Sequence, residues 1–113
     1  MSLEVLKKFD DNTNSWVVEP IGEVDIYTSP VLKEVFLQII DEKAANITIN
    51  GEKLVYIDST GLGILISALK KAKENNNEIT ITNLKPSIKK LFDLTSLDKV
   101  FTIKEWLVVW WII

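Results

Sequence analysis

Three residue types are missing from this 113-residue chain: cysteine, histidine and arginine. Without cysteine there is no disulfide, no thiol nucleophile and no thiolate ligand for zinc. Without histidine the chain lacks the commonest general base and the commonest metal ligand. All 13 basic residues are lysines, so a guanidinium cannot bind a phosphate in bidentate fashion. These absences argue against an enzyme and against a metal site.

Charge and length narrow the class of protein further. The formal net charge is −3 at pH 7, whereas a protein that binds nucleic acid needs a basic face. Apolar residues make up 47% and charged residues 26%, which is typical of a globular domain with one core. Residues 1–11 show no basic start followed by an apolar run, so no secretory signal is expected. We therefore expect one cytoplasmic domain without a cofactor.

The run IDSTGLG at 57–63 is the most informative feature of the chain. It lies between an apolar stretch, LVYI, and an amphipathic pattern that predicts a helix from about Thr60 to Asn75. At such a strand-to-helix turn, free backbone N–H groups and the positive end of the helix dipole favour an anion. Ser59 is therefore interpreted as a modification target that can carry a phosphate without disrupting the fold. The structural alternative is a helix N-cap, which an Asp-Ser pair also suits.

Two other interpretations of this run, as a catalytic nucleophile and as a nucleotide-binding loop, are disfavoured. A nucleophile elbow, Gly-x-Ser-x-Gly, requires glycine at position 57, which is isoleucine, and a catalytic triad requires histidine. No Gly-Lys-Ser/Thr follows the two glycines, and Ile66 stands where a dinucleotide-binding fingerprint has its third glycine. Gly61 and Gly63 are instead expected to allow close packing and to free backbone N–H groups. The protein is not expected to be an enzyme.

The other segments alternate between strand and helix patterns. Strands at about 3–9 and 15–21 flank the turn DDNTN and form a hairpin, in which Pro20 predicts a bulge or a strand end. Thr28, followed by Ser29 and Pro30, predicts a helix that starts with a hydroxyl cap. This order predicts an α/β domain whose central sheet has about five mostly parallel strands, with an antiparallel N-terminal strand and three to four flanking helices. The remaining segments are strands at 46–50 and 78–82, a helix at 86–94 and an extended stretch at 97–103.

The sequence resembles the STAS domain of anti-sigma factor antagonists, the anti-anti-sigma factors of bacterial partner-switching systems. The matching segments are GEVD at 22–25, YIDSTGLG at 56–63 and NLKPSIKKLFDLTSLDKVF at 83–101. In that family the serine after the aspartate is phosphorylated by a kinase that is also the anti-sigma factor. The unphosphorylated antagonist binds the kinase and frees the sigma factor, and phosphorylation breaks the complex.

The resemblance implies roles for particular residues. Ser59 is the implied phosphoacceptor, Asp58 is its acidic neighbour, and Asp25 matches the acidic residue of the loop after the second strand. The implied partners are an anti-sigma factor with serine kinase activity and a phosphatase, with no metal, cofactor or nucleic acid. The residues expected to bind the partner are Asp25, Asp58, Thr60, Gly61 and Leu62.

The segment 106–113, WLVVWWII, is uncharged and differs from the rest of the chain. It is far shorter than the roughly 20 residues needed to span a bilayer, so no membrane span is expected. In water it would be prone to aggregate. Three interpretations stay open: burial against the fold, pairing with a second copy in a homodimer, or an altered terminus. Residues 1–105 are accordingly expected to form the STAS-like domain, with 106–113 as a tail of open role.

Two other functions remain open at the level of the sequence. A STAS domain can act as a scaffold or regulatory domain outside sigma-factor control. A designed or engineered protein could also keep the fold without the switch. Phosphate incorporation at Ser59 separates both from the first interpretation.

Overall fold

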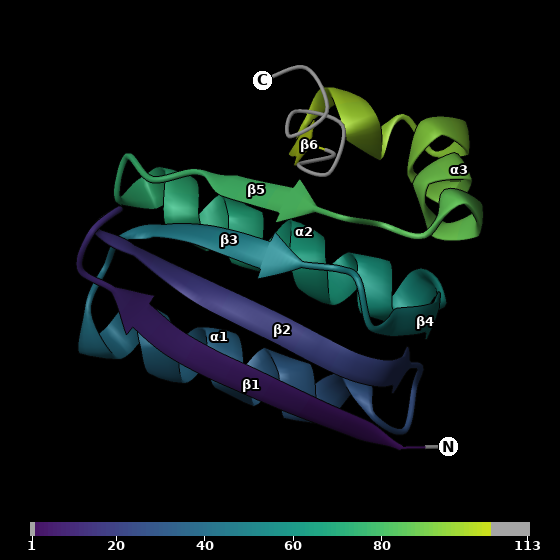
Figure 1. Cartoon of the computed structure of the whole chain (residues 1–113), viewed down its shortest axis with the longest axis horizontal. Coiled ribbons are helices and arrows are strands. Elements are labelled where there is room, and N and C mark those ends of the chain that lie inside the picture. The colour runs from purple at the N-terminus through teal and green to yellow at the C-terminus, as the bar shows by residue number, and fades with distance from the viewer. Residues whose placement is uncertain (1, 105–113) are drawn as a thin grey trace.

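The computed structural model describes residues 2–104, and the predictions made for the tail at 106–113 lie outside this range. Strands and helices alternate along most of the chain (Figure 1). The elements are β1 (Leu3–Asp10), β2 (Ser15–Val24), α1 (Ser29–Glu42), β3 (Asn46–Asn50), β4 (Leu54–Ile57), α2 (Ser59–Glu74), β5 (Ile79–Thr82), α3 (Pro86–Leu94), the short 3₁₀ helix η1 (Leu97–Lys99) and β6 (Thr102–Lys104).

The six strands form one mixed sheet. Strand β1 pairs antiparallel with β2, while β3, β5 and β6 follow in parallel order. Strand β2 is long enough to pair with β3 through Ser15–Val18 and with β4 through Gly22–Val24. The predicted mixed, mostly parallel sheet with an antiparallel N-terminal strand is confirmed. Within residues 2–104 it holds six strands rather than about five, because both 54–57 and 102–104 join it.

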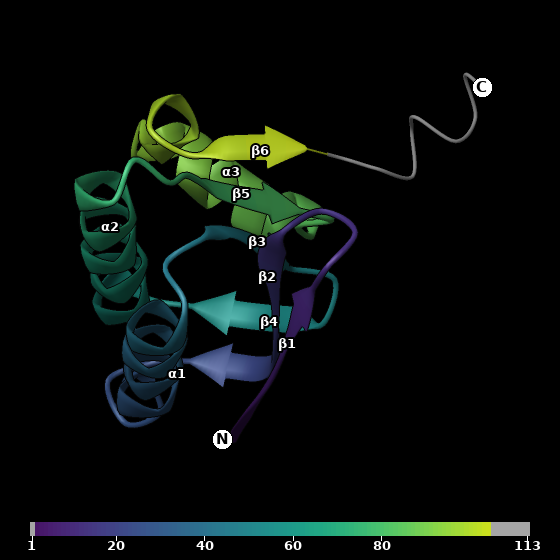
Figure 2. The ribbon, with the colours of Figure 1, turned by 90° about the vertical axis from the view of Figure 1, so that its left-hand side faces the viewer.

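Helices α1 and α2 lie side by side on one face of the sheet, and Figure 2 shows both on the same side. Alternate residues of β3 and β5 point to this face, because successive side chains of a strand face opposite sides. The core between helices and sheet is fully apolar at its centre. Its most deeply buried side chains are Val18, Val24, Leu32, Ile39, Ile47, Ile79, Ile81 and Phe92.

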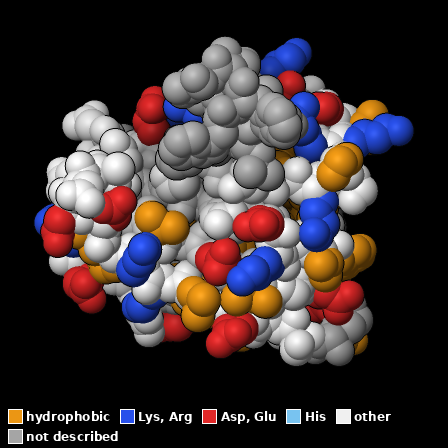
Figure 3. Space-filling view, viewed as in Figure 1, with side chains coloured by type: hydrophobic (Ala, Val, Ile, Leu, Met, Phe, Trp, Pro, Cys, Tyr) orange, Lys and Arg blue, Asp and Glu red, His pale blue; other side chains and the backbone are white. Residues whose placement is uncertain are grey.

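The surface carries charges of both signs. On the part of the face shown in Figure 3 that the structure describes, acidic and lysine side chains are interspersed without a large region of one sign. Among residues 2–104, no helix combines the length and apolarity required to cross a bilayer.

The prediction that Pro20 marks a bulge or a strand end is wrong. Strand β2 continues past Pro20, and its irregularity lies elsewhere. Pro20 pairs with Val5 of β1 and lies in the gap between the stretch that pairs with β3 and the stretch that pairs with β4. The register shift falls instead between Gly22 and Glu23. Gly22 has φ +117°, a conformation that favours glycine, and its N–H donates to the Lys53 carbonyl over 3.0 Å. The strand therefore reaches Val24, beyond the end predicted at about residue 21.

Candidate functional site

Strands β2 and β4 end next to each other at one edge of the sheet. Val24 and Ile57 are paired in register, and the N–H of Asp58 donates to the Val24 carbonyl over 3.1 Å. The next residues of the two strands, Asp25 and Asp58, therefore start neighbouring loops although they are far apart in the sequence. This edge brings together the two acidic residues that sequence analysis singled out.

Asp58, not Ser59, caps helix α2. Its backbone is extended, and its carboxylate Oδ1 accepts a hydrogen bond from the N–H of Gly61 over 3.1 Å. This is the geometry of an N-cap, so the alternative interpretation of Ser59 as the cap is wrong. Ser59 is the first residue of the helix and its side chain is exposed. The hydroxyl is therefore accessible to another protein at the positive end of the helix dipole.

The five predicted partner-binding residues do not form one exposed surface. Asp58 and Thr60 are half-buried, whereas Asp25, Gly61 and Leu62 are buried. Leu62 belongs to the core cluster, so packing accounts for it. Contacts between the buried residues and a partner stay a prediction. In the structure, each of these residues packs or forms hydrogen bonds within the domain.

Gly61 and Gly63 differ in what surrounds them, and this difference is testable. A Cβ on Gly61 would lie 2.5 Å from Cγ1 of Ile57 and 2.7 Å from Cγ1 of Val24, whereas a Cβ on Gly63 would meet nothing within 4 Å. Gly61→Ala is expected to destabilise the fold by about 1–3 kcal/mol through overpacking. Gly63→Ala is expected to stabilise it by about 0.5–1 kcal/mol, because glycine is unfavourable inside a helix. Urea denaturation of both variants measures this, and equal effects would contradict the packing described here.

Asp25 holds the turn between β2 and α1. Its Oδ1 accepts hydrogen bonds from the N–H groups of Tyr27 at 2.8 Å and Thr28 at 2.9 Å, and the Thr28 hydroxyl oxygen lies 3.2 Å from it. The Thr28 N–H, the strongest influence, and the Tyr27 N–H lower the pKa of Asp25 below its ordinary value, although burial opposes them. Asp25 is thus an ionised brace for the backbone of this loop.

The predicted hydroxyl cap of α1 is wrong, because the Thr28 side chain makes its hydrogen bonds within the preceding loop. Thr28 precedes the helix but makes no side-chain cap bond. Its hydroxyl donates instead to the Glu23 carbonyl at 2.7 Å and accepts from the Asp25 N–H at 2.9 Å. The threonine therefore closes the loop onto the end of β2 rather than capping the helix.

The braced loop presents two exposed apolar side chains. Ile26 is 63% exposed and Tyr27 is 87% exposed. Sequence analysis missed both residues. The signal for them was a pair of apolar residues directly after Asp25, in a segment expected to be a loop. Exposed apolar groups on a rigid loop favour protein binding, because little conformational entropy is lost when they are buried.

The bonds to Asp25 predict a pH dependence of stability. A protonated carboxyl cannot accept these hydrogen bonds as an anion does, and the folded pKa of Asp25 lies below its ordinary value of 3.8. The stabilisation is therefore complete above the unfolded pKa and is lost as the pH falls through the folded pKa. Denaturation measured from pH 6 to pH 2 should show a smaller acid loss in Asp25→Asn than in the wild type. Identical pH profiles would contradict this role.

The groups at this site are few and mostly uncharged apart from Asp25 and Asp58. In the region the structure describes, no group of three or more acidic side chains is arranged to hold a metal ion. What the edge offers is an exposed hydroxyl at a helix start and an apolar loop beside it. These features are an α/β fold with exposed polar and apolar groups where β2 and β4 end.

Comparison with known proteins identifies the family. The family model described as "STAS domain" matches residues 5–107, and the chain belongs to this family. The anti-sigma-B factor antagonist of Staphylococcus aureus is 36% identical over 84 residues, which cover 74% of this chain and 78% of that protein.

Solved structures share the fold. An anti-sigma factor antagonist from Mycobacterium paratuberculosis matches with a TM-score of 0.75 and 27% identity, over 90% of this chain and 85% of that one. The Bacillus cell fate determinant SpoIIAA in its phosphorylated form matches with a TM-score of 0.66 and 17% identity, over 91% of each chain. The mixed α/β fold predicted from the sequence is therefore the fold of this family.

Proposed function

We propose that this protein is a cytoplasmic anti-sigma factor antagonist switched by phosphorylation of Ser59. Unmodified, it binds an anti-sigma factor that is also a serine kinase; phosphorylated, it releases that partner until a phosphatase restores the hydroxyl. The protein itself catalyses nothing. The observation that carries this proposal is the exposed hydroxyl of Ser59 at the first residue of α2.

The position of Ser59 explains how a phosphate acts without unfolding the domain. A phosphate adds about −1.5 to −2 charges at neutral pH. Beside the N-terminus of α2 the fold tolerates this charge, because the helix dipole is positive there. A protein surface packed against Ser59 and against the apolar Ile26 and Tyr27 does not tolerate it. The switch therefore needs only repulsion and desolvation at an interface.

The relatives support the proposal. The similar protein of Staphylococcus aureus is named as an antagonist of an anti-sigma-B factor, and SpoIIAA has been solved in a phosphorylated form. A shared fold alone does not fix function. The exposed Ser59 of this chain is therefore needed to extend the role of these relatives to this protein.

Intact-mass spectrometry tests the proposal. The protein is incubated with the anti-sigma-B factor of Staphylococcus aureus, ATP and Mg²⁺, and its mass is expected to rise by one phosphate. Ser59→Ala should remove the added mass, and peptide mapping should place the phosphate on Ser59 in the wild type. Ser87→Ala, at an exposed serine near the start of α3, is the control and should keep it. Binding without phosphate would contradict the switch and favour a scaffold outside sigma-factor control.

A further inference from the structure

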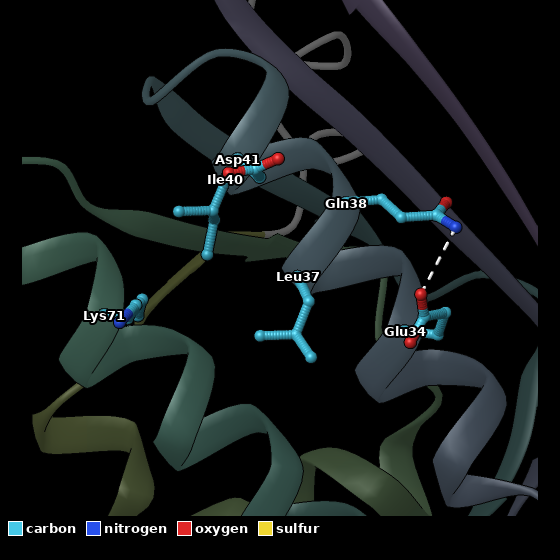
Figure 4. Close-up of a pocket in the computed structure, with 6 residues that line it drawn as sticks. All are labelled: Glu34, Leu37, Gln38, Ile40, Asp41 and Lys71. Carbon is cyan, nitrogen blue, oxygen red and sulfur yellow. Dashed lines mark hydrogen bonds between the residues drawn. The ribbon is translucent and has the colours of Figure 1, made fainter.

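A groove runs between α1 and α2 on the outer side of the helices. It consists of two adjoining hollows, of about 520 and 180 Å³, which share Leu37, Ile40 and Lys71. Figure 4 shows Leu37 and Ile40 of α1 and Lys71 of α2 around this space. Leu37 is 48% exposed although it is a large apolar residue. None of the residues of the proposed switch lines the groove.

The α2 side of this groove lies on the same helix as Ser59, the proposed switch residue. Thr60 follows Ser59, and Ile64, Ser67 and Lys71 lie four, seven and eleven residues further along α2. Residues with this spacing share one face of a helix. With a rise of 1.5 Å per residue, Ser67 lies about 12 Å along the helix axis from Ser59. A single protein surface of ordinary size spans this distance.

The rim of the groove has charges of both signs. Lys33 and Lys71 stand beside Glu34 and Asp41 around the apolar floor. A nucleic acid or an anionic lipid surface would require a rim of positive sign. An apolar centre with a mixed polar rim is instead the usual composition of a protein interface.

We infer that the anti-sigma factor that reaches Ser59 also inserts an apolar side chain into the α1–α2 groove. This inference rests on the proposed function and adds a second contact region to it. Leu37 and Ile64 receive the apolar group, and the mixed rim pairs with opposite charges on the partner. The groove lies a few helical turns from Ser59. A phosphate on Ser59 therefore does not itself disrupt the contacts that the partner makes in the groove.

A second copy of the chain is the alternative occupant of the groove, and the experiment below detects it.

The test compares two leucines of equal exposure. Leu37→Glu places a charge in the groove, and Leu6→Glu places the same charge on β1; both leucines are 48% exposed. Lys7 donates to Gln38 of α1 over 3.1 Å, so its neighbour Leu6 faces the other side of the sheet. Affinity for the Staphylococcus aureus anti-sigma-B factor is measured by calorimetry without ATP. Leu37→Glu is expected to weaken binding at least tenfold, and Leu6→Glu less than twofold.

Each result decides between the inference and the proposed function. A Ser59→Asp variant, which places a negative charge at the switch, is measured alongside. Wild-type affinity in Leu37→Glu, together with weakened binding in Ser59→Asp, would overturn the inference and leave the proposed function intact. No binding by the wild type would overturn both. Sedimentation velocity of the free protein is the second readout: a dimer dissociated by Leu37→Glu would show that a second copy fills the groove, and would overturn the inference.

The stability of the variants is the control, and equal denaturation midpoints are expected for Leu37→Glu and Leu6→Glu. A Lys71→Glu variant tests the same groove from α2, and unchanged binding there and in Leu37→Glu would overturn the inference irrespective of stability.

Discussion

Replacing Ser59 by aspartate is expected to weaken binding to the anti-sigma factor about a hundredfold, or about 2.7 kcal/mol. The side chain is exposed at the start of α2, so its new charge meets the partner and not the core. The same charge complements the helix dipole, so the free energy of unfolding should stay equal or rise by about 0.3–1 kcal/mol. Calorimetric titration and urea denaturation measure the two quantities on the same preparation.

A charge placed elsewhere is the matched control. Asn12→Asp adds the same charge in the exposed turn between β1 and β2 and should leave the affinity unchanged. Ser59→Ala should also bind normally, because it adds no charge. Wild-type affinity in Ser59→Asp would contradict the role of charge at this position. A loss of affinity caused by unfolding would do so as well, and the denaturation data would reveal it.

Phe92→Ala is expected to cost about 3–5 kcal/mol of folding free energy, a large part of the total for one small domain. Phe92 is completely buried and packs edge-to-face against Phe101, with ring centroids 6.0 Å apart. It also faces the apolar interior beneath Val24 and Ile57, the last residues of β2 and β4. A cavity there removes support from both strand ends at the functional edge. Thermal and urea denaturation give the loss of stability.

A neighbouring residue of the same helix provides the comparison. Leu94 is 74% exposed, so Leu94→Ala should change the free energy of unfolding by no more than about 0.5 kcal/mol. Similar losses for the two variants would mean that α3 does not close the core as described.

The sequence predicted the layers of the fold because its periodicities are strong. The apolar positions of 60–75 fall on one face of a helix, and the structure places a helix at Ser59–Glu74 with that face buried. The segments NITIN and EITIT became the parallel strands β3 and β5. Patterns of this kind depend only on which side of an element faces the core, so they are readable without tertiary contacts.

What the sequence could not predict depends on pairing between distant residues. Pro20 is tolerated in β2 because β3 and β4 leave a gap opposite it, and no local pattern encodes that gap. The cap of α2 is Asp58 and not Ser59, a difference of one residue that only the backbone geometry decides. Asp25 turned out to brace its own loop, because its hydrogen bonds to Tyr27 and Thr28 require the chain to fold back.

The most direct test of the switch is the affinity of one preparation before and after enzymatic phosphorylation of Ser59. The unmodified protein should bind the anti-sigma factor, and the phosphorylated protein should bind at least a hundredfold more weakly with an unchanged circular dichroism spectrum. Treatment with a phosphatase should restore the original affinity. Equal affinity of the two forms would contradict the account.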